Sequence, residues 1–199
     1  MAAPCTMILL DPELETDRAS ASAAAKQAAA SGALKNLRIP STRTLGRFLA
    51  QAQAAVGLSG QVTVLLTTDA TLRGLNRRFR GKDAATDVLS FASTNPASGL
   101  EKIAGDVAIS VETARKQAAE QGHALGVELR VLVLHGLLHL AGYDHETDAG
   151  KMQRRERQLR EKLGLPPGLI ERAGAKRESA RKPRSAAAGH ARVTRRRKP

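Results

Sequence analysis

The chain has 199 residues, enough for one domain of about 150 residues with its own core and additional terminal segments. Lys and Arg outnumber Asp and Glu by 32 to 19, and the net charge of +13 favours a polyanionic partner such as nucleic acid or an anionic membrane. With no Trp, one Tyr and three Phe, the composition argues against broad stacking of bases on aromatic side chains.

The N-terminal region combines a strand-like segment with a stretch of low complexity. Thr6–Leu10 is apolar enough for a strand, whereas residues 16–38 are rich in Ala and Ser with a few basic residues. We interpret this stretch as an insertion; the alternative is an organelle transit peptide, which the preceding strand disfavours. The single cysteine, Cys5, excludes an internal disulfide, and no run is long enough to span a membrane. We therefore expect a cytoplasmic protein.

Strands and helices alternate in the central region. Ser41 or Thr42 can cap a helix that runs to about Val56. Its apolar residues recur on one face, at Leu45, Phe48, Leu49 and Ala52. Further along the chain we expect a strand over residues 61–67, followed by a short helix that Asp69 caps and that runs through Leu72 and Leu75. Two more strands follow, over residues 87–92 and 103–110, with a turn between them at 95–99. Three helices come last, over residues 112–121, 126–141 and 149–163.

These elements predict an α+β fold, with a small mixed sheet of about four strands packed with about five helices. The helix at 126–141 is apolar almost all round, as expected of a helix in the centre of the domain. We predict one domain over residues 1–170, in which 16–38 is the insertion.

Residues 171–199 carry much of the positive charge. They contain eleven Lys or Arg against two acids, and almost no apolar periodicity. Such a segment cannot bury enough surface to order itself, so we predict a basic disordered tail. It is either a solvated end or an arm that binds phosphates without sequence preference.

The strongest chemical signal is a cluster of three histidines. His135 and His139 are four residues apart on a predicted helix, so their rings project from one face a turn apart. Gly142 is suited to a left-handed helix end, and the turn there would bring His145 back toward the other two. Three imidazoles leave a fourth position open on a divalent ion, as in catalytic zinc sites, although nickel, copper and iron also accept these ligands. We assign His123 and His190 to the surface.

The spacing of the cluster also matches that of metzincin peptidases, and its helix is zincin-like. In those enzymes a glutamate, the general base, follows the first histidine, whereas this chain has Gly136. A peptidase is therefore disfavoured. Asp144 and Glu146 adjoin the cluster and either orient a histidine, accept a proton or are exposed loop residues.

Three blocks of sequence resemble the YbeY-type endoribonucleases, the bacterial ribosomal RNA maturation factors. The blocks are LNRRFRGKDAATDVLSF at 75–91, GDVAIS at 105–110 and HGLLHLAGYDH at 135–145. The resemblance implies one divalent ion, usually zinc, on the three histidines. It also implies cleavage of single-stranded RNA, maturation of the 3′ end of small-subunit (16S) ribosomal RNA, a part in ribosome quality control, and ribosomal RNA and the small ribosomal subunit or its proteins as partners.

The resemblance places the family's functional arginine at Arg80. A guanidinium can hold a phosphate by two parallel hydrogen bonds and stabilise negative charge in a phosphoryl transition state. The neighbouring Arg77 and Arg78 are not singled out by the resemblance, so we interpret them as solvated residues of a helix end. Thr86, Asp87, Ser90 and Phe91 either line the cleft or serve packing and capping.

Three hypotheses follow from the sequence. The leading one is a metal-dependent endoribonuclease in which Arg80 clamps the phosphate. The second is a metallopeptidase with metzincin-like geometry, and the third is a noncatalytic ribosome-binding factor with a structural metal. Whether water or a ribose hydroxyl is the nucleophile stays open.

Overall fold

The computed structural model describes residues 6–14, 38–93, 102–145 and 147–166. Several predictions fall outside these residues, namely those for Cys5, Glu146, His190, the stretch at 16–37, the turn at 95–99 and the tail at 171–199.

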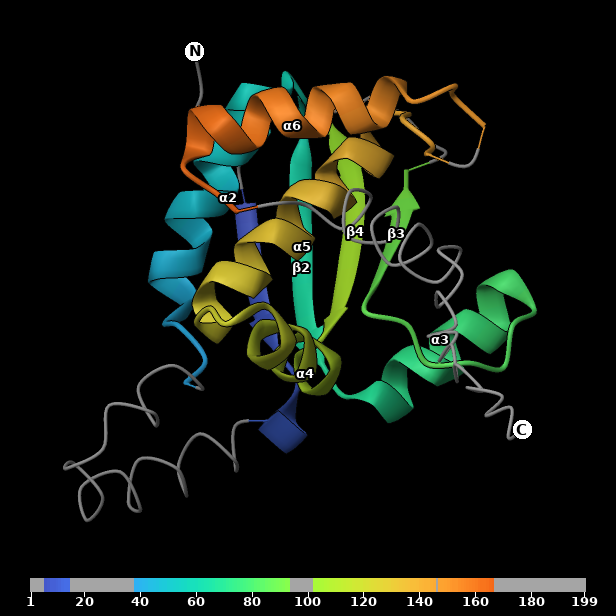
Figure 1. Ribbon diagram of the computed structural model, residues 1–199. Helices are drawn as coiled ribbons and strands as arrows, with labels where there is room; N and C mark the ends of the chain where they lie inside the picture. The colour runs from blue at the N-terminus through green and yellow to red at the C-terminus, as the bar shows by residue number, and fades with distance from the viewer. Residues whose placement is uncertain (1–5, 15–37, 94–101, 146, 167–199) are drawn as a thin grey trace, which may run out of the picture.

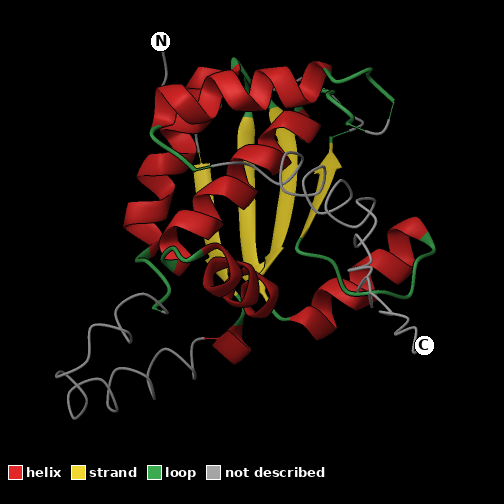
Figure 2. Ribbon diagram, viewed as in Figure 1, coloured by secondary structure: helices red, strands yellow, loops and turns green. Residues whose placement is uncertain are grey.

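Four strands form one mixed sheet in the order β1-β2-β4-β3. β1 (Thr6–Leu10), β2 (Gln61–Thr67) and β4 (Ile103–Ser110) are parallel, and β3 (Val88–Ala92) lies antiparallel to β4 at the edge. This arrangement confirms the predicted small mixed sheet of an α+β fold. Figure 2 shows the strands behind a layer of helices.

Helices cover the two faces of the sheet unequally. α2 (Thr42–Val56) and α5 (Leu125–Leu140) pack on one face, where their apolar side chains form the main core with the inward residues of the strands. α4 (Val111–Gln121) packs against α5, and α6 (Lys151–Leu163) crosses its C-terminal part (Figure 1). α3 (Asp69–Arg80) lies on the opposite face, where Leu72 packs against Leu89 and Ala108.

The two predicted N-caps have different outcomes. Ser41 caps α2, since its hydroxyl accepts a hydrogen bond from the backbone N–H of Thr44 at 3.2 Å. The prediction that Asp69 caps α3 is wrong, because Thr68 is the N-cap and Asp69 is the first helical residue. The Asp69 carboxylate instead accepts hydrogen bonds from α4 and the residue before it; the donors are Ser110, Thr113 and Lys116. Sequence alone could not separate two adjacent residues that both make good caps.

The central helix, α5, lies so close to the sheet that position 136 has no room for a side chain. A Cβ atom on Gly136 would lie 2.7 Å from Cγ1 of Val107 and 3.2 Å from Oγ of Ser90. The Ser90 hydroxyl also donates a hydrogen bond to the Gly136 carbonyl at 3.2 Å. The glycine therefore sets the distance between the helix and the strands beneath it.

We expect Gly136→Ala to lower the free energy of unfolding by about 1–3 kcal/mol, the usual cost of overpacking a core. The overlap with Val107 should outweigh the roughly 1 kcal/mol by which alanine favours a helix over glycine. Urea unfolding measures the change. Gly74→Ala in α3 is the matched control, because nothing lies within 4 Å of its added Cβ and stability should rise slightly. If Gly136→Ala is as stable as this control, α5 does not pack closely against Val107 at this position.

Among the described residues, no single helix combines the length and apolar composition of a membrane span. Only α4 and α5 taken together reach them, and these two helices meet at a bend of 113°.

Candidate metal centre

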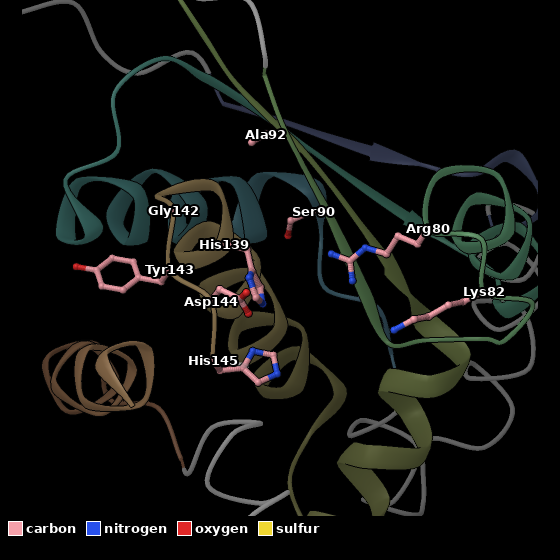
Figure 3. Close-up of a pocket in the computed structure, with 9 residues that line it drawn as sticks. All are labelled: Arg80, Lys82, Ser90, Ala92, His139, Gly142, Tyr143, Asp144 and His145. Carbon is pink, nitrogen blue, oxygen red and sulfur yellow. The ribbon is translucent and has the colours of Figure 1, made fainter. Parts of the chain in front are cut away.

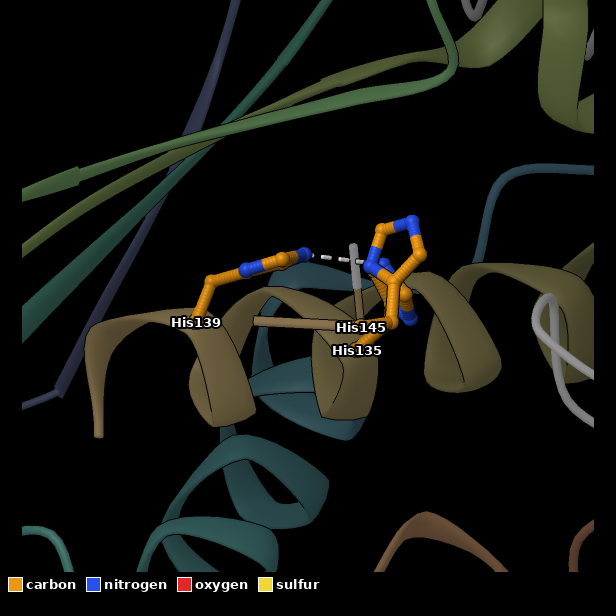
Figure 4. Close-up of side chains that lie close together, drawn as sticks. All are labelled: His135, His139 and His145. Carbon is orange, nitrogen blue, oxygen red and sulfur yellow. Dashed lines mark hydrogen bonds between the residues drawn. The ribbon is translucent and has the colours of Figure 1, made fainter. Parts of the chain in front are cut away.

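The end of α5 brings the three clustered histidines together (Figure 4). His135 and His139 lie one turn apart on the last part of the helix, which ends at Leu140. Gly142 then adopts a left-handed conformation with φ of 87°, as predicted, and the chain turns back so that His145 faces the other two rings. Sequence spacing therefore predicted both the cluster and the bend that closes it.

The geometry of the three rings fits a divalent ion. One ligand nitrogen from each ring lies within 4.8 Å of the others, and Nε2 of His135 is 3.1 Å from Nε2 of His139. Two nitrogens bound to a tetrahedral zinc ion at 2.0–2.1 Å would be about 3.3 Å apart. His135 is buried, whereas the side chain of His145 is exposed, so the fourth side of the site faces solvent. The donor set and its opening suit a catalytic metal.

The surroundings of His139 keep its ring neutral. Burial first, and then the charges of His135 and His145, lower the pKa of His139 from 6.5 to about 4. A hydrogen bond with the Tyr143 backbone and the charge of Asp144 oppose this shift only in part. At neutral pH the ring therefore offers a lone pair, which a metal ligand requires.

This pKa makes the stability of the metal-free protein depend on pH. Between pH 6.5 and 4 the unfolded chain binds a proton at His139 that the folded chain does not. The contribution to stability is therefore complete above pH 6.5 and is lost as the pH falls toward 4. We expect urea unfolding of the metal-free protein to show this loss, and His139→Gln to show a smaller one. An equally steep loss in that variant would contradict the assignment.

The sequence analysis missed a carboxylate behind the metal centre. Glu156 on α6 is 1% exposed, and its Oε1 lies 3.3 Å from Nδ1 of His135. In the tautomer that this contact favours, the Nδ1–H group donates a hydrogen bond to the carboxylate, and Nε2 of the same ring keeps its lone pair on the side that faces His139. Glu156 is therefore in a position to hold the tautomer and orientation of His135. Glu156 is 21 residues from His135 in sequence, which is not a ligand-like spacing. The only signal for it in the sequence was its place on the buried face of an amphipathic helix.

We expect Glu156→Ala to weaken metal affinity by roughly 10–100-fold, as is usual for a partner that orients a ligand. Glu156→Gln should lose less metal affinity, because its amide oxygen can still accept a hydrogen bond from Nδ1–H of His135. Competition with a chelator of known affinity measures the change. Glu161→Ala is the matched control, since Glu161 is an exposed acid on the same helix. Equal affinities for the Glu156→Ala and Glu161→Ala proteins would remove the positioning role.

The metal centre opens into a pocket of about 600 Å³ (Figure 3). His139 and His145 line one side, and Arg80 and Lys82 line the other, with their charged ends directed toward the histidines. Arg80 is the last residue of α3, and the left-handed Gly81 that follows turns the chain so that Lys82 reaches the same space. The predicted functional arginine therefore shares a pocket with the predicted metal ligands.

Several other candidate residues have structural partners. Asp87 accepts hydrogen bonds from its neighbour Thr86, from the backbone of Val88 and from Gln117 on α4, which supports the capping interpretation. Ser90 both lines the pocket and bonds to α5. Asp144 lines the pocket as well, and its carboxylate accepts a hydrogen bond from the Thr147 hydroxyl at 2.9 Å.

Two expectations outside the pocket are settled by packing. The placement of His123 on the surface is wrong: its side chain is 16% exposed, and Nε2 lies 2.5 Å from Oε2 of the fully buried Glu128. Position 136, where a metzincin carries its general base, points into the sheet, and a glutamate there would overlap Val107. The geometry therefore gives no support to a peptidase of that type.

Three histidines with an open fourth side, in a pocket with a cationic wall, are an arrangement that suits a metal-dependent hydrolase of anionic substrates. Comparison with known proteins gives the family. The family model described as Endoribonuclease YbeY matches residues 26–164, and this chain belongs to that family.

Two curated relatives carry the same name. The protein of Koribacter versatilis is 52% identical over 152 residues, which cover 75% of this chain and 97% of the relative. The protein of Solibacter usitatus is 53% identical over 126 residues, or 63% and 82% of the two chains. The solution structure of TM1509 from Thermotoga maritima matches 74% of this chain and 95% of its own, with a TM-score of 0.44 and 24% identity.

Proposed function

We propose that this protein is a metal-dependent endoribonuclease that cleaves single-stranded RNA. The observation that carries the proposal is the shared pocket, in which a site for a divalent ion faces Arg80 and Lys82. Membership of the YbeY family, whose curated members are named endoribonucleases, supports the same reaction.

The residues of the pocket have distinct roles in this reaction. The guanidinium of Arg80 holds the scissile phosphate through paired hydrogen bonds and stabilises the extra charge of the transition state. Lys82 adds a second positive charge. His135, His139 and His145 would hold the ion, and Glu156 keeps the proton on Nδ1 of His135. A bound divalent ion supplies Lewis acidity and lowers the pKa of a water molecule.

The biological role that we propose is more specific than the reaction that the pocket supports. We propose that the substrate is small-subunit ribosomal RNA, that cleavage matures its 3′ end, and that the protein takes part in ribosome quality control. Zinc is the proposed ion, the small ribosomal subunit or its proteins are the proposed partners, and the cytoplasm is the proposed location. The family resemblance supports the substrate, the process and the partners, the single cysteine supports the cytoplasm, and the three-imidazole donor set suits zinc.

A cleavage assay tests the proposal. Zinc-loaded protein is incubated with a small-subunit ribosomal RNA fragment that carries a single-stranded 3′ extension, and with the same fragment annealed to a complementary strand. We expect cuts in the free extension, protection of the duplex, loss of activity on chelation and its return with zinc. Analysis of the new 3′ ends identifies the nucleophile. A 2′,3′-cyclic phosphate indicates attack by the ribose 2′-hydroxyl, and a 3′-hydroxyl paired with a 5′-phosphate indicates attack by water. Failure of the metal-loaded protein to cut either RNA would overturn the proposal.

A further inference from the structure

The face of the sheet that carries α3 is only partly covered. Met7 and Leu9 on β1 are each 43% exposed, although they are large apolar side chains. A groove of about 460 Å³ runs between this face and α3. Its lining is mainly apolar: Leu9, Thr63, Leu65, Leu75, Phe79, Phe91, Asp106, Val107 and Ala108.

Phe79 is the most exposed large apolar residue in the described part of the chain, at 58%. Its ring packs edge to face against Phe91, with centroids 5.2 Å apart and planes at 67°. The guanidinium of Arg78 lies 5.3 Å from the centre of the same ring. Two of the three phenylalanines in the chain thus form a fixed aromatic pair at the end of α3, and one of them stays open to solvent.

The charges around Phe79 indicate what this ring contacts. Four cations, Arg77, Arg78, Arg80 and Lys82, lie within six residues of sequence that contain no acid. The next residue, Asp83, is already paired with Arg73 at 2.7 Å. Four cations with no acid among them suit the phosphates of a nucleic acid, and an aromatic ring in their midst suits an unpaired base.

The aromatic pair also adjoins the metal pocket. Phe91 faces the groove, while its neighbours on β3, Ser90 and Ala92, line the metal pocket on the other face. At the end of α3, Phe79 faces the groove and Arg80 the pocket. β3 is the edge strand, so within the described residues no further strand separates the two sites. A single strand of RNA can therefore pass around this edge from one site to the other.

We infer that Phe79, supported by Phe91, is a stacking platform for an unpaired base near the phosphate that Arg80 holds. This inference rests on the proposed function and adds a binding subsite to it. A stacked base requires an unpaired nucleotide, which accounts for single-strand specificity in terms of this chain's own residues. Stacking tolerates any base, so the platform selects strandedness and not sequence.

A tryptophan at position 79 gives a direct readout, because the chain contains no other tryptophan. Phe79→Trp protein is titrated with a cleavage-resistant single-stranded oligoadenylate, a 2′-O-methyl phosphorothioate. We expect saturable quenching of the indole fluorescence as a base stacks on it. Ala54→Trp is the matched control, because Ala54 is an exposed residue of α2 on the other face of the sheet; its fluorescence should change little.

Equilibrium binding to the same oligonucleotide supplies the second test. A stacked base contributes about 1–3 kcal/mol, so Phe79→Leu should bind roughly 5- to 150-fold more weakly than wild type. Phe79→Trp should bind at least as tightly as wild type, because it retains an aromatic face. Leucine preserves apolar bulk, and a thermal melt checks that the variant is folded.

Three outcomes separate the possibilities. Wild-type affinity in Phe79→Leu would overturn the platform and point to a protein as the occupant of the groove. Binding by Phe79→Trp without quenching would also overturn it, while leaving the endoribonuclease proposal intact. A wild-type protein that neither binds nor cuts single-stranded RNA would remove the proposed function itself.

Discussion

Replacing His139 with alanine is expected to abolish metal binding and RNA cleavage together. The variant would keep only two of the three converging nitrogens, and it would lose the ring whose Nε2 lies 3.1 Å from that of His135. The loss of metal affinity should exceed the roughly 10–100-fold typical of residues behind a ligand. Metal analysis of freshly purified protein, alongside initial cleavage rates, measures both effects.

The control for this variant is a histidine outside the centre. His123→Gln removes an imidazole while retaining a polar group near the buried Glu128, so metal content and activity should stay near wild type. A His139→Ala protein that still binds one ion per chain would show that these rings do not form the site. Cleavage at the wild-type rate by a His139→Ala protein purified free of contaminating nucleases would equally contradict the proposed mechanism.

Arg80→Ala should separate metal binding from catalysis. Arg80 lies on the pocket wall opposite the histidines, so its loss should leave the metal in place. Removing a donor that stabilises transition-state charge typically lowers kcat by about 10²–10³-fold. Arg80→Lys should recover part of this loss, because an amine keeps the charge but not the paired hydrogen bonds. Single-turnover rates at saturating RNA measure the effect.

Arg77 provides the matched control for Arg80. It is an exposed arginine in the last turn of α3, and it does not line the metal pocket. Arg77→Ala should therefore weaken RNA binding slightly and make it somewhat less dependent on salt, with little change in kcat. If the two alanine variants lose kcat equally, the effect of Arg80 comes from the general positive charge of the helix end and not from its place in the pocket.

The metal centre was the part of the molecule that sequence could predict best. Its three candidate ligands lie within eleven residues, and helical periodicity together with one left-handed glycine determines how they meet. The strands and the long helices were also predictable, because apolar periodicity is local. Arg80 was different: nothing in its local pattern distinguished it from Arg77 or Arg78, and only the family resemblance singled it out.

Features that depend on contacts between distant segments could not be predicted. The contact of Glu156 with His135 exists because α6 packs across α5. The pairing of Phe79 with Phe91 exists because α3 packs on the outer face of β3. The low aromatic content argued against broad base stacking, yet tertiary packing brought two of the three phenylalanines together. Gly136 could be recognised as a departure from the peptidase pattern, but its steric reason lies in Val107 on another strand.

The carboxylate of Glu156 connects α6 to the candidate metal ligand His135 on α5. The ligands belong to one short stretch of chain, whereas Glu156 arrives on a helix that must dock separately. If the docked position of α6 raises the affinity of His135 for an ion, then, by thermodynamic linkage, binding of the ion stabilises the docked position of α6 to the same extent. We therefore expect ion binding and the docking of α6 to be coupled, so that the amide hydrogens of α6 exchange more slowly when an ion is bound, although α6 carries none of the three candidate ligands.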